Sequence, residues 1–341
     1  MDSLSQIALG AAVGVAVMGR RTSLGRAALW GAVCGTLPDL DALIDHGDAV
    51  RNMTLHRAES HALFFLTLAS PLIAALIARL HGEWHQVRRW CLAVWLVLIT
   101  HPLLDTMTVY GTQLARPFSD TPYGVGSIFI IDPLYTLPLL FGVGIALRRR
   151  GDARGLRWNH AGLLLSTAYL AWGVVAQNEV RAVAERQLRT QAPDVERILV
   201  TPTPFNSVLW RIVAVTPTHY VEGYRSLLDG DAPIQFVRDR RHPELYEPLR
   251  ETEAVARLAA FSHGFFAMSE VEGQIRMADL RMGQAPYFFF TFVVGQRDGE
   301  QLRAAAVDSV GARSPAGPGL RWLLRRPFDP SLPSPYPVGV Y

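Results

Sequence analysis

Six long apolar runs in the first half of the chain constrain its fold more than any other sequence feature. Each run is near the ~20 residues that a membrane-spanning helix needs, or somewhat shorter. Half of the 341 residues are hydrophobic and only 18% are charged, which is too apolar for an ordinary soluble protein of this length. We therefore expect a membrane α-helical bundle of about six helices, the first two of them short. The runs lie at about residues 4–19, 27–45, 61–78, 90–110, 128–147 and 159–177.

The first two runs are marginal membrane spans when taken alone, but their small residues indicate that they pack as a pair. Gly and Ala recur closely in "ALGAAVGVAVMG" and "AALWGAVCG", and small residues let helix backbones approach each other in lipid. A cleaved signal peptide is the competing interpretation of the N-terminus. Because "MDSLSQ" carries no basic residue ahead of the apolar stretch, we expect both helices to be retained.

The basic residues other than histidine are all arginines, and their placement predicts the orientation of the helices. The alternate connections at about 38–60 and 105–127 carry only Arg51, Arg57 and Arg116. The other connections are arginine-rich, so the positive-inside rule makes them cytoplasmic. The net charge of +3 is too small and too scattered to indicate a nucleic-acid partner. The arginines of the cytoplasmic set are Arg20, Arg21, Arg26, Arg79, Arg88, Arg89, Arg148, Arg149, Arg150, Arg154 and Arg157.

After Asn178 the character of the sequence changes. A charged connector follows, and stretches such as "VLWRIVAV", "QIRMADLRM" and "YFFFTFVVG" alternate as strands do. We expect an amphipathic helix around 243–261 and an irregular, Pro-rich tail from Ser314. The chain is thus divided into a transmembrane helical domain at residues 1–178 and an extramembrane, β-rich α+β domain at residues 179–341. Both cysteines, Cys34 and Cys91, lie in apolar runs and predict no disulfide framework.

Three polar motifs interrupt the apolar runs, all on the side opposite the arginine-rich connections. In the first, Pro38 ends or kinks the second helix ahead of two aspartates. In the third, a histidine and an aspartate four residues apart share one helix face. The polar residues of the three motifs are Asp39 and Asp41, then His56, Arg57, Glu59 and His61, and then His101 and Asp105.

Each motif also has an ordinary structural explanation. The first pair of aspartates fits a solvated turn, the two histidines of the second motif fit an interfacial position, and the third motif fits a helix-stabilising pair. Asp132, isolated in "IFIIDPLYTL", fits a helix N-cap. Ionisable groups at membrane depth are costly, however, by ~2.5 kcal/mol or more at the centre. Three motifs on one side therefore predict a shared centre, and imidazole with carboxylate suits zinc, manganese or iron.

At these motifs the chain resembles a known family. The segments "MDSLSQIALGAAVG", "GTLPDLD", "HRAESHA", "THPLLD", "YGTQLARPFS" and "IIDPLYTLPLL" are similar to those of the YdjM-like bacterial inner-membrane proteins, which are described as metal-dependent hydrolases. The resemblance covers residues 1–147 closely, and "TPTPFNSVLWR" and "MADLRMG" resemble the extension of longer members. It implies a multi-pass protein of the bacterial inner (cytoplasmic) membrane with a His/Asp metal centre. The matching positions are Asp39, Asp41, His56, His61, His101 and Asp105.

The sequence departs from the family pattern at Glu59, where the family has Gly or Phe before Thr-His-Ser. Ser60 keeps the hydroxyl, and Glu59 is either a local acid/base or a solvated side chain. In the mechanism that we expect, the three histidines and one or two aspartates hold zinc, with manganese and iron as alternatives. A spare carboxylate, Asp105 or Glu59, acts as the base, and Arg57 clamps a phosphate or carboxylate.

The expected activity is therefore hydrolysis of a lipid-like phosphoester, or another ester, at the outer face of the membrane. Membrane lipids are then its partners, and the C-terminal domain lies outside the cytoplasm. Two other classes of function stay open. A non-enzymatic binding or regulatory protein would use the metal as a structural ion. An ion transporter would need a polar path to the opposite face, and segments such as "AALIARL" and "FGVGIAL" offer none.

Overall fold

The computed structural model describes residues 1–149 and 152–334, which form two compact units. The N-terminal unit comprises residues 1–44, 57–174 and 204–206, and the C-terminal unit comprises residues 45–56, 175–203 and the chain from residue 207 onward. The change of unit near residue 175 lies close to the expected domain boundary. The assignment of residues 45–56 to the C-terminal unit was not foreseen from the sequence.

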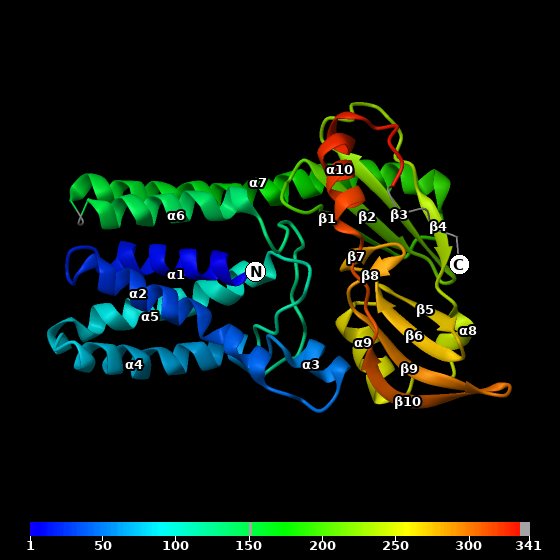
Figure 1. Cartoon of the computed structure of the whole chain (residues 1–341), viewed down its shortest axis with the longest axis horizontal. Helices are drawn as coiled ribbons and strands as arrows, with labels where there is room; N and C mark the ends of the chain where they lie inside the picture. Colours follow the sequence, from blue (N-terminus) through cyan, green and yellow to red (C-terminus); the bar gives the residue numbers. More distant parts are fainter. Residues whose placement is uncertain (150–151, 335–341) are drawn as a thin grey trace. The chain divides into compact units, whose positions relative to one another are not determined.

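The N-terminal unit is helical, and Figure 1 shows its helices lying side by side. Contacts join α1 to α2, α5 and α6, and join α4 to α5. Three short 3-10 helices, η1, η2 and η3, follow helix ends or precede helix starts. The helices are α1 (Ser3–Met18), α2 (Leu24–Thr36), η1 (Pro38–Leu43), η2 (Glu59–His61), α4 (Leu63–Leu80), η3 (Trp84–Gln86), α5 (Val87–Thr106), α6 (Pro133–Arg148) and the first part of α7 (Ala153–Gln191).

The close packing of α1 against α2 follows from their glycines, as the small-residue pattern predicts. A Cβ atom added to Gly35 would lie 2.7 Å from the backbone oxygen of Gln6, and one added to Gly14 would lie 3.1 Å from the Cα of Gly31. Only glycine therefore permits this backbone separation. The helix starts are set by side-chain caps, since Asp2 accepts a hydrogen bond from the Ser5 N–H and Ser23 accepts one from the Arg26 N–H.

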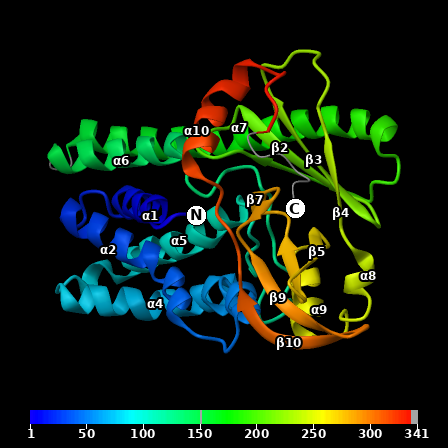
Figure 2. The same cartoon turned by 45° about the vertical axis from the view of Figure 1, so that its right-hand side comes forward.

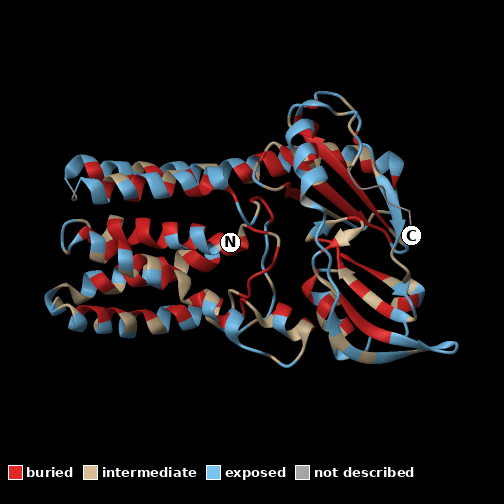
Figure 3. Cartoon of the chain, viewed as in Figure 1, coloured by how far each residue is buried: buried red, intermediate tan, exposed pale blue. Residues whose placement is uncertain are grey.

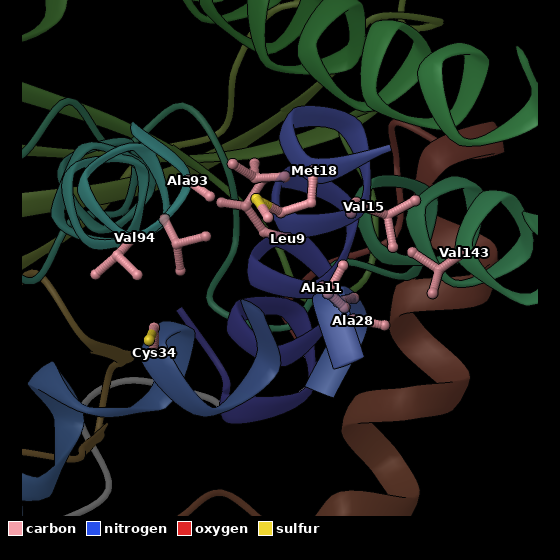
Figure 4. Close-up of a cluster of buried hydrophobic side chains, with 14 of the residues drawn as sticks. Leu9, Ala11, Val15, Met18, Ala28, Cys34, Ala93, Val94 and Val143 are labelled. Atoms are coloured by element: carbon pink, nitrogen blue, oxygen red, sulfur yellow. The ribbon is translucent and has the colours of Figure 1, made fainter. Parts of the chain in front are cut away.

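A single apolar cluster forms the core of the bundle. It includes fully buried side chains from several helices, among them Val15, Met18, Ile77, Trp90 and Leu98. Figure 4 shows side chains of this kind gathering around α1. The two cysteines form no disulfide: Cys34 is buried in this core and Cys91 is half-buried.

Two stretches of the described chain are long and apolar enough to cross a membrane, namely Leu63–Leu80 and Trp84–Thr106. Two further helices, α1 and α6, are apolar but shorter. Along α4 the exposed side chains include Leu68, Leu72 and Leu76, each at least half exposed and four residues from the next. Exposed faces of the helices appear in pale blue in Figure 3. An apolar exposed stripe of this kind is typical of a helix that faces lipid.

The C-terminal unit is β-rich, which confirms the expected change in fold after the helical region. A four-stranded antiparallel sheet has the order β1-β2-β3-β4, a second has the order β10-β9-β6-β5, and β7 pairs with β8. The strands are β1 (Arg197–Pro202), β2 (Leu209–Val215), β3 (His219–Ser226), β4 (Val237–Arg240), β5 (Phe266–Val271), β6 (Gln274–Asp279), β7 (Gly283–Gln284), β8 (Tyr287–Phe288), β9 (Thr291–Asp298) and β10 (Gln301–Ser309).

Helices complete the C-terminal unit. The second part of α7 covers one face of the first sheet, where Ala176 and Val180 pack with Trp210 of β2. Helix α10 (Ala316–Arg325), red in Figure 2, places Trp322 against Tyr224 of β3, with ring centroids 4.7 Å apart. The remaining helices are α3 (Ala49–Leu55), α8 (Pro243–Tyr246), α9 (Glu253–Phe261) and η4 (Arg326–Phe328).

Two local predictions were wrong. The single helix expected at 243–261 is two helices, α8 and α9, because Pro248 lies between them and lacks the N–H that a continuous helix requires. The tail expected to be irregular contains α10, whose Pro318 sits in the first turn, where a proline is tolerated. Residues 335–341 of that tail lie outside the described part of the chain.

Candidate metal centre

Four of the predicted ligands meet in the N-terminal unit, and we call these residues the His/Asp centre: Asp39, His61, His101 and Asp105. Asp39 lies in η1, directly after Pro38 ends the preceding helix. His61 closes η2, just before α4 begins. His101 and Asp105 lie one turn apart on α5, as their spacing predicts.

Five of the six separations between the donor atoms of the His/Asp centre are close to those in a tetrahedral metal site, and all four atoms lie within 4.8 Å of one another. The two Nε2 atoms of His61 and His101 are 3.1 Å apart. His61 Nε2 lies 3.4 Å from Asp39 Oδ1 and 3.3 Å from Asp105 Oδ2, and His101 Nε2 lies 3.5 Å from each of the same two oxygens. Ligands ~2.0–2.1 Å from a tetrahedral ion are separated by about 3.3–3.4 Å. The observed distances therefore fit a metal ion held by two nitrogens and two oxygens.

The Nδ1 atom of each histidine, which points away from the centre, already has a hydrogen-bond partner. This partner determines whether Nε2, which points into the centre, carries a proton or a lone pair. His101 Nδ1 lies 2.7 Å from the backbone oxygen of Gly35, which can only accept a hydrogen bond. His61 Nδ1 lies 2.8 Å from Ser60 Oγ, and this hydroxyl donates to Asp41 Oδ2. Both rings therefore carry their proton on Nδ1 and turn a lone pair inward on Nε2.

Four acceptor atoms thus converge in a site that is almost entirely buried. The side chains of His61 and Asp105 are 0% exposed, that of His101 is 1% exposed and that of Asp39 is 21% exposed. Acceptors that face one another away from water repel, so a positive charge between them is needed. The partners of the two Nδ1 atoms, a backbone carbonyl and a hydroxyl backed by a carboxylate, also resemble the usual supporting groups of metal-binding histidines. The residues present therefore fit a divalent metal.

The pKa of His61 also shows that the carboxylates around it favour a positive charge. Burial alone would lower the pKa of this ring. Hydrogen bonds with Asp105, Asp39 and Asp41 outweigh burial and raise the pKa to about 9. A proton on His61 and a metal ion are thus alternative cations for the same carboxylates, since a metal ligand must be deprotonated.

Arg57 lies beside the His/Asp centre in an unusual backbone conformation. Its φ is 65°, a left-handed value that is uncommon outside glycine. The side chain is 3% exposed, its guanidinium stacks 4.9 Å from the Tyr110 ring centroid, and Nε lies 3.3 Å from Asp105 Oδ2. Nε and Nη1 make no hydrogen bond with the part of the chain that the structure describes. A buried guanidinium whose Nη1 has neither a hydrogen bond nor an ion pair among the described residues therefore points to an anionic ligand.

Gln6 and Ser60 support the His/Asp centre; from the sequence, Ser60 was noted only for its hydroxyl and Gln6 was not singled out. Gln6 Nε2 donates to Asp105 Oδ1 at 3.0 Å and to the backbone oxygen of His101 at 3.2 Å. The amino nitrogen of Met1 also contacts Asp105 Oδ1. A fully buried glutamine in the apolar helix α1 was the available signal, because such a group needs a polar partner inside the bundle.

The other predicted site residues lie outside the four-residue group. Asp41 accepts hydrogen bonds from the Arg57 N–H and the Ser60 hydroxyl, so it supports His61 from behind. His56 ends α3 in the C-terminal unit. Glu59 is exposed and forms a 2.7 Å ion pair with Arg116. Asp132 caps α6 by accepting from the Leu134 N–H, as its ordinary explanation predicts.

Comparison with known proteins relates this chain to a protein family. The chain is 26% identical over 313 residues to "Uncharacterized protein YfhP" of Bacillus subtilis (strain 168), covering 86% of this chain and 90% of that protein. No solved structure is significantly similar. Residues 1–180, which contain the whole centre, match the family described as "YdjM inner membrane protein". The chain therefore belongs to the YdjM inner membrane protein family.

Proposed function

We propose that this protein is a membrane-embedded, zinc-dependent hydrolase that cleaves a lipid-like phosphoester, or another ester, at the outer face of the inner membrane. One observation carries the proposal. The buried guanidinium of Arg57, whose Nε pairs with Asp105 and whose Nη1 makes no hydrogen bond with the described residues, lies beside four donor atoms that could hold a metal ion. A purely structural metal site has no need for a guanidinium beside it with a buried donor left for a ligand.

When bound, a divalent ion supplies a Lewis acid and lowers the pKa of a nearby water. The chain's own residues then supply orientation and charge. Gly35 and the Ser60–Asp41 pair hold the two imidazole rings. Asp105 holds Arg57 in place. Arg57 binds the phosphate or carboxylate group of the substrate through its planar array of donors.

We propose that water reaches the His/Asp centre beside Asp39 and that Glu59 is not the base. Asp39 is the member of the His/Asp centre that solvent reaches, since 21% of its side chain is exposed. A general base must lie within hydrogen-bonding reach of the water it activates. Glu59 instead lies on the surface with Arg116 as its partner. Asp39 therefore marks the side from which water and substrate approach.

The test compares wild type, Arg57→Lys and metal-stripped protein in detergent on phospholipid and isoprenoid-phosphate substrates. Lysine keeps the charge and loses the planar geometry, so turnover should fall by about tenfold or more while metal content stays at the wild-type level. His85→Ala, an exposed histidine of η3, is the matched control and should change neither quantity. Absence of metal-dependent turnover over the whole panel would contradict the proposal.

A second function is favoured by the number of ligands. Four protein ligands complete a tetrahedral shell, as they do in structural zinc sites, whereas catalytic sites keep an open position. The protein would then be a non-enzymatic, metal-stabilised membrane binding protein. In that case stripping the metal should lower the melting temperature without abolishing any turnover, because binding energy to a structural ion is folding energy.

A further inference from the structure

A groove of about 800 Å³ lies along α6 and α7, away from the His/Asp centre. Its walls are apolar along most of their length and include Leu137, Phe141 and Trp158. Arg148, at the last turn of α6, is the charged residue among the described groups that line it. The groove is therefore a long apolar surface with a cation at one end.

Small residues explain why the groove exists. A Cβ added to Gly142 would lie 3.0 Å from the Cα of Asn159, so the two helices approach closely at this point. Gly144 lies on the same helix but on the open side, where an added Cβ would meet no atom within 4 Å. The rings of Phe141 and Trp158 meet edge to face, 5.9 Å apart, over the closely packed helices. Gly142 thus allows the close contact between the helices, and Gly144 leaves the groove unfilled.

The lining side chains are exposed in the structure. Leu137 is 58% exposed, Phe141 is 61% exposed and Trp158 is 48% exposed. Such a concentration of large apolar side chains requires an apolar occupant. The groove extends from Leu134 to Arg148, about 20 Å of helix axis, which exceeds the ~15 Å depth of one hydrocarbon leaflet. An acyl chain would therefore fit along it.

The positive charge at one end of the groove indicates which lipid head group would bind there. Arg148 lines the groove, Arg149 caps the end of α6, and Arg154 and Arg157 lie near the start of α7. The positive-inside rule assigns this end to the cytoplasmic leaflet. Basic pockets between membrane helices on that side bind anionic head groups, and tryptophan favours the membrane–water boundary. We infer that the α6–α7 groove binds an anionic phospholipid, with an acyl chain along the groove and the phosphate at Arg148.

The experiment uses native mass spectrometry of the full-length protein in detergent, with equal concentrations of phosphatidylglycerol and phosphatidylcholine. Gly144→Leu places a larger side chain in the groove, starting from a Cβ that meets no atom within 4 Å, and Arg148→Ala removes the head-group cation. Gly25→Leu, on α2, is the matched control because an added Cβ there also meets no atom within 4 Å. Melting temperatures of all variants verify that each one is folded.

Wild type and Gly25→Leu should retain phosphatidylglycerol in preference to phosphatidylcholine. Gly144→Leu should lower that retention, and Arg148→Ala should lower it by about fivefold. Unchanged retention in Gly144→Leu would overturn the inference. Equal retention of the two lipids by wild type would overturn the selection of an anionic head group. A wild-type dimer that Gly144→Leu converts to a monomer would overturn it in favour of a second copy of the chain.

Discussion

His61 and His101 face each other through nitrogens that both act as acceptors, and two carboxylate oxygens close the same space. Because these acceptors are buried from water, a cation between them would stabilise the arrangement. The hydrogen-bond partner of each Nδ1 atom determines that the Nε2 atom of the same ring is the one available to a metal. The metal-binding hypothesis therefore depends on the outer hydrogen bonds as much as on the inner distances.

The first prediction concerns the two histidines. His61→Ala and His101→Ala should each remove most of the bound metal, because each deletes one of four ligands. Metal content per protein, measured by elemental analysis after purification, is the readout. His85→Ala should keep the wild-type content, since His85 is exposed on η3. Full metal content in both ligand variants would exclude the His/Asp centre as the binding site.

The second prediction concerns the support behind His61. Ser60→Ala should lower metal affinity by about 10–100-fold, because the hydroxyl that orients the ring through Nδ1 is lost. Competition with a chelator of known affinity measures the effect. Glu59→Gln changes the adjacent, exposed side chain and should leave the metal affinity as it is. Equal affinities in the two variants would show that the ring needs no such support.

The sequence predicts part of this site and misses the rest for physical reasons. His101 and Asp105 share a helix face at a spacing that local geometry determines. The choice between His56 and His61 depends on the left-handed turn at Arg57, which leaves one histidine at the centre and the other at the end of α3. Gln6 reaches Asp105 from a helix about a hundred residues away in sequence. Such a contact depends on tertiary packing and has no local pattern.

At the scale of the elements, the α1–α2 pair rests on glycines that let two backbones touch. Gly10, Gly31 and Gly35 come from both helices and face each other. The apolar and small-residue patterns of the sequence predict this pair and the helical character of the first half of the chain. Helix ends and breaks are less predictable. The hydrophobic periodicity of residues 243–261 favours one helix, whereas Pro248 divides this segment into α8 and α9.

The third prediction follows from this packing. Gly31→Ala should destabilise the protein by about 1–3 kcal/mol, because the new Cβ would overlap the backbone of Gly10. Gly25→Ala, on the same helix, meets no atom and should stabilise it by up to about 1 kcal/mol through helix propensity. Thermal or chemical denaturation in detergent compares the two variants. Equal stability in both would contradict the close contact of α1 and α2.

At the scale of the whole molecule, the chain enters the C-terminal unit three times, at residues 45, 175 and 207. Residues 45–56 leave the N-terminal unit between the first and second polar motifs and pack as α3 within the C-terminal unit. Val50 and Met53 are buried there, and Arg51 forms a two-pronged ion pair with Glu253 of α9. No local pattern predicts this insertion, since it depends on contacts about 200 residues apart.

The fourth prediction concerns membrane topology. The arginine-rich connection near Arg150 is expected in the cytoplasm and the C-terminal unit outside it. A reporter fused after Arg150 should therefore behave as cytoplasmic, and one fused after Asp194, beyond the end of α7, as external. The opposite pattern would place the His/Asp centre on the cytoplasmic side and remove the outer leaflet as the source of substrate.

The central claim is that Asp39, His61, His101 and Asp105 bind one metal ion, and X-ray absorption of the purified protein tests it most directly. We expect one equivalent of zinc, with two imidazole and two carboxylate ligands at about 2.0–2.1 Å. The same spectrum should disappear from the His61→Ala, His101→Ala double variant. A wild-type spectrum that persists in the double variant, or sulfur ligands in the wild type, would contradict the claim.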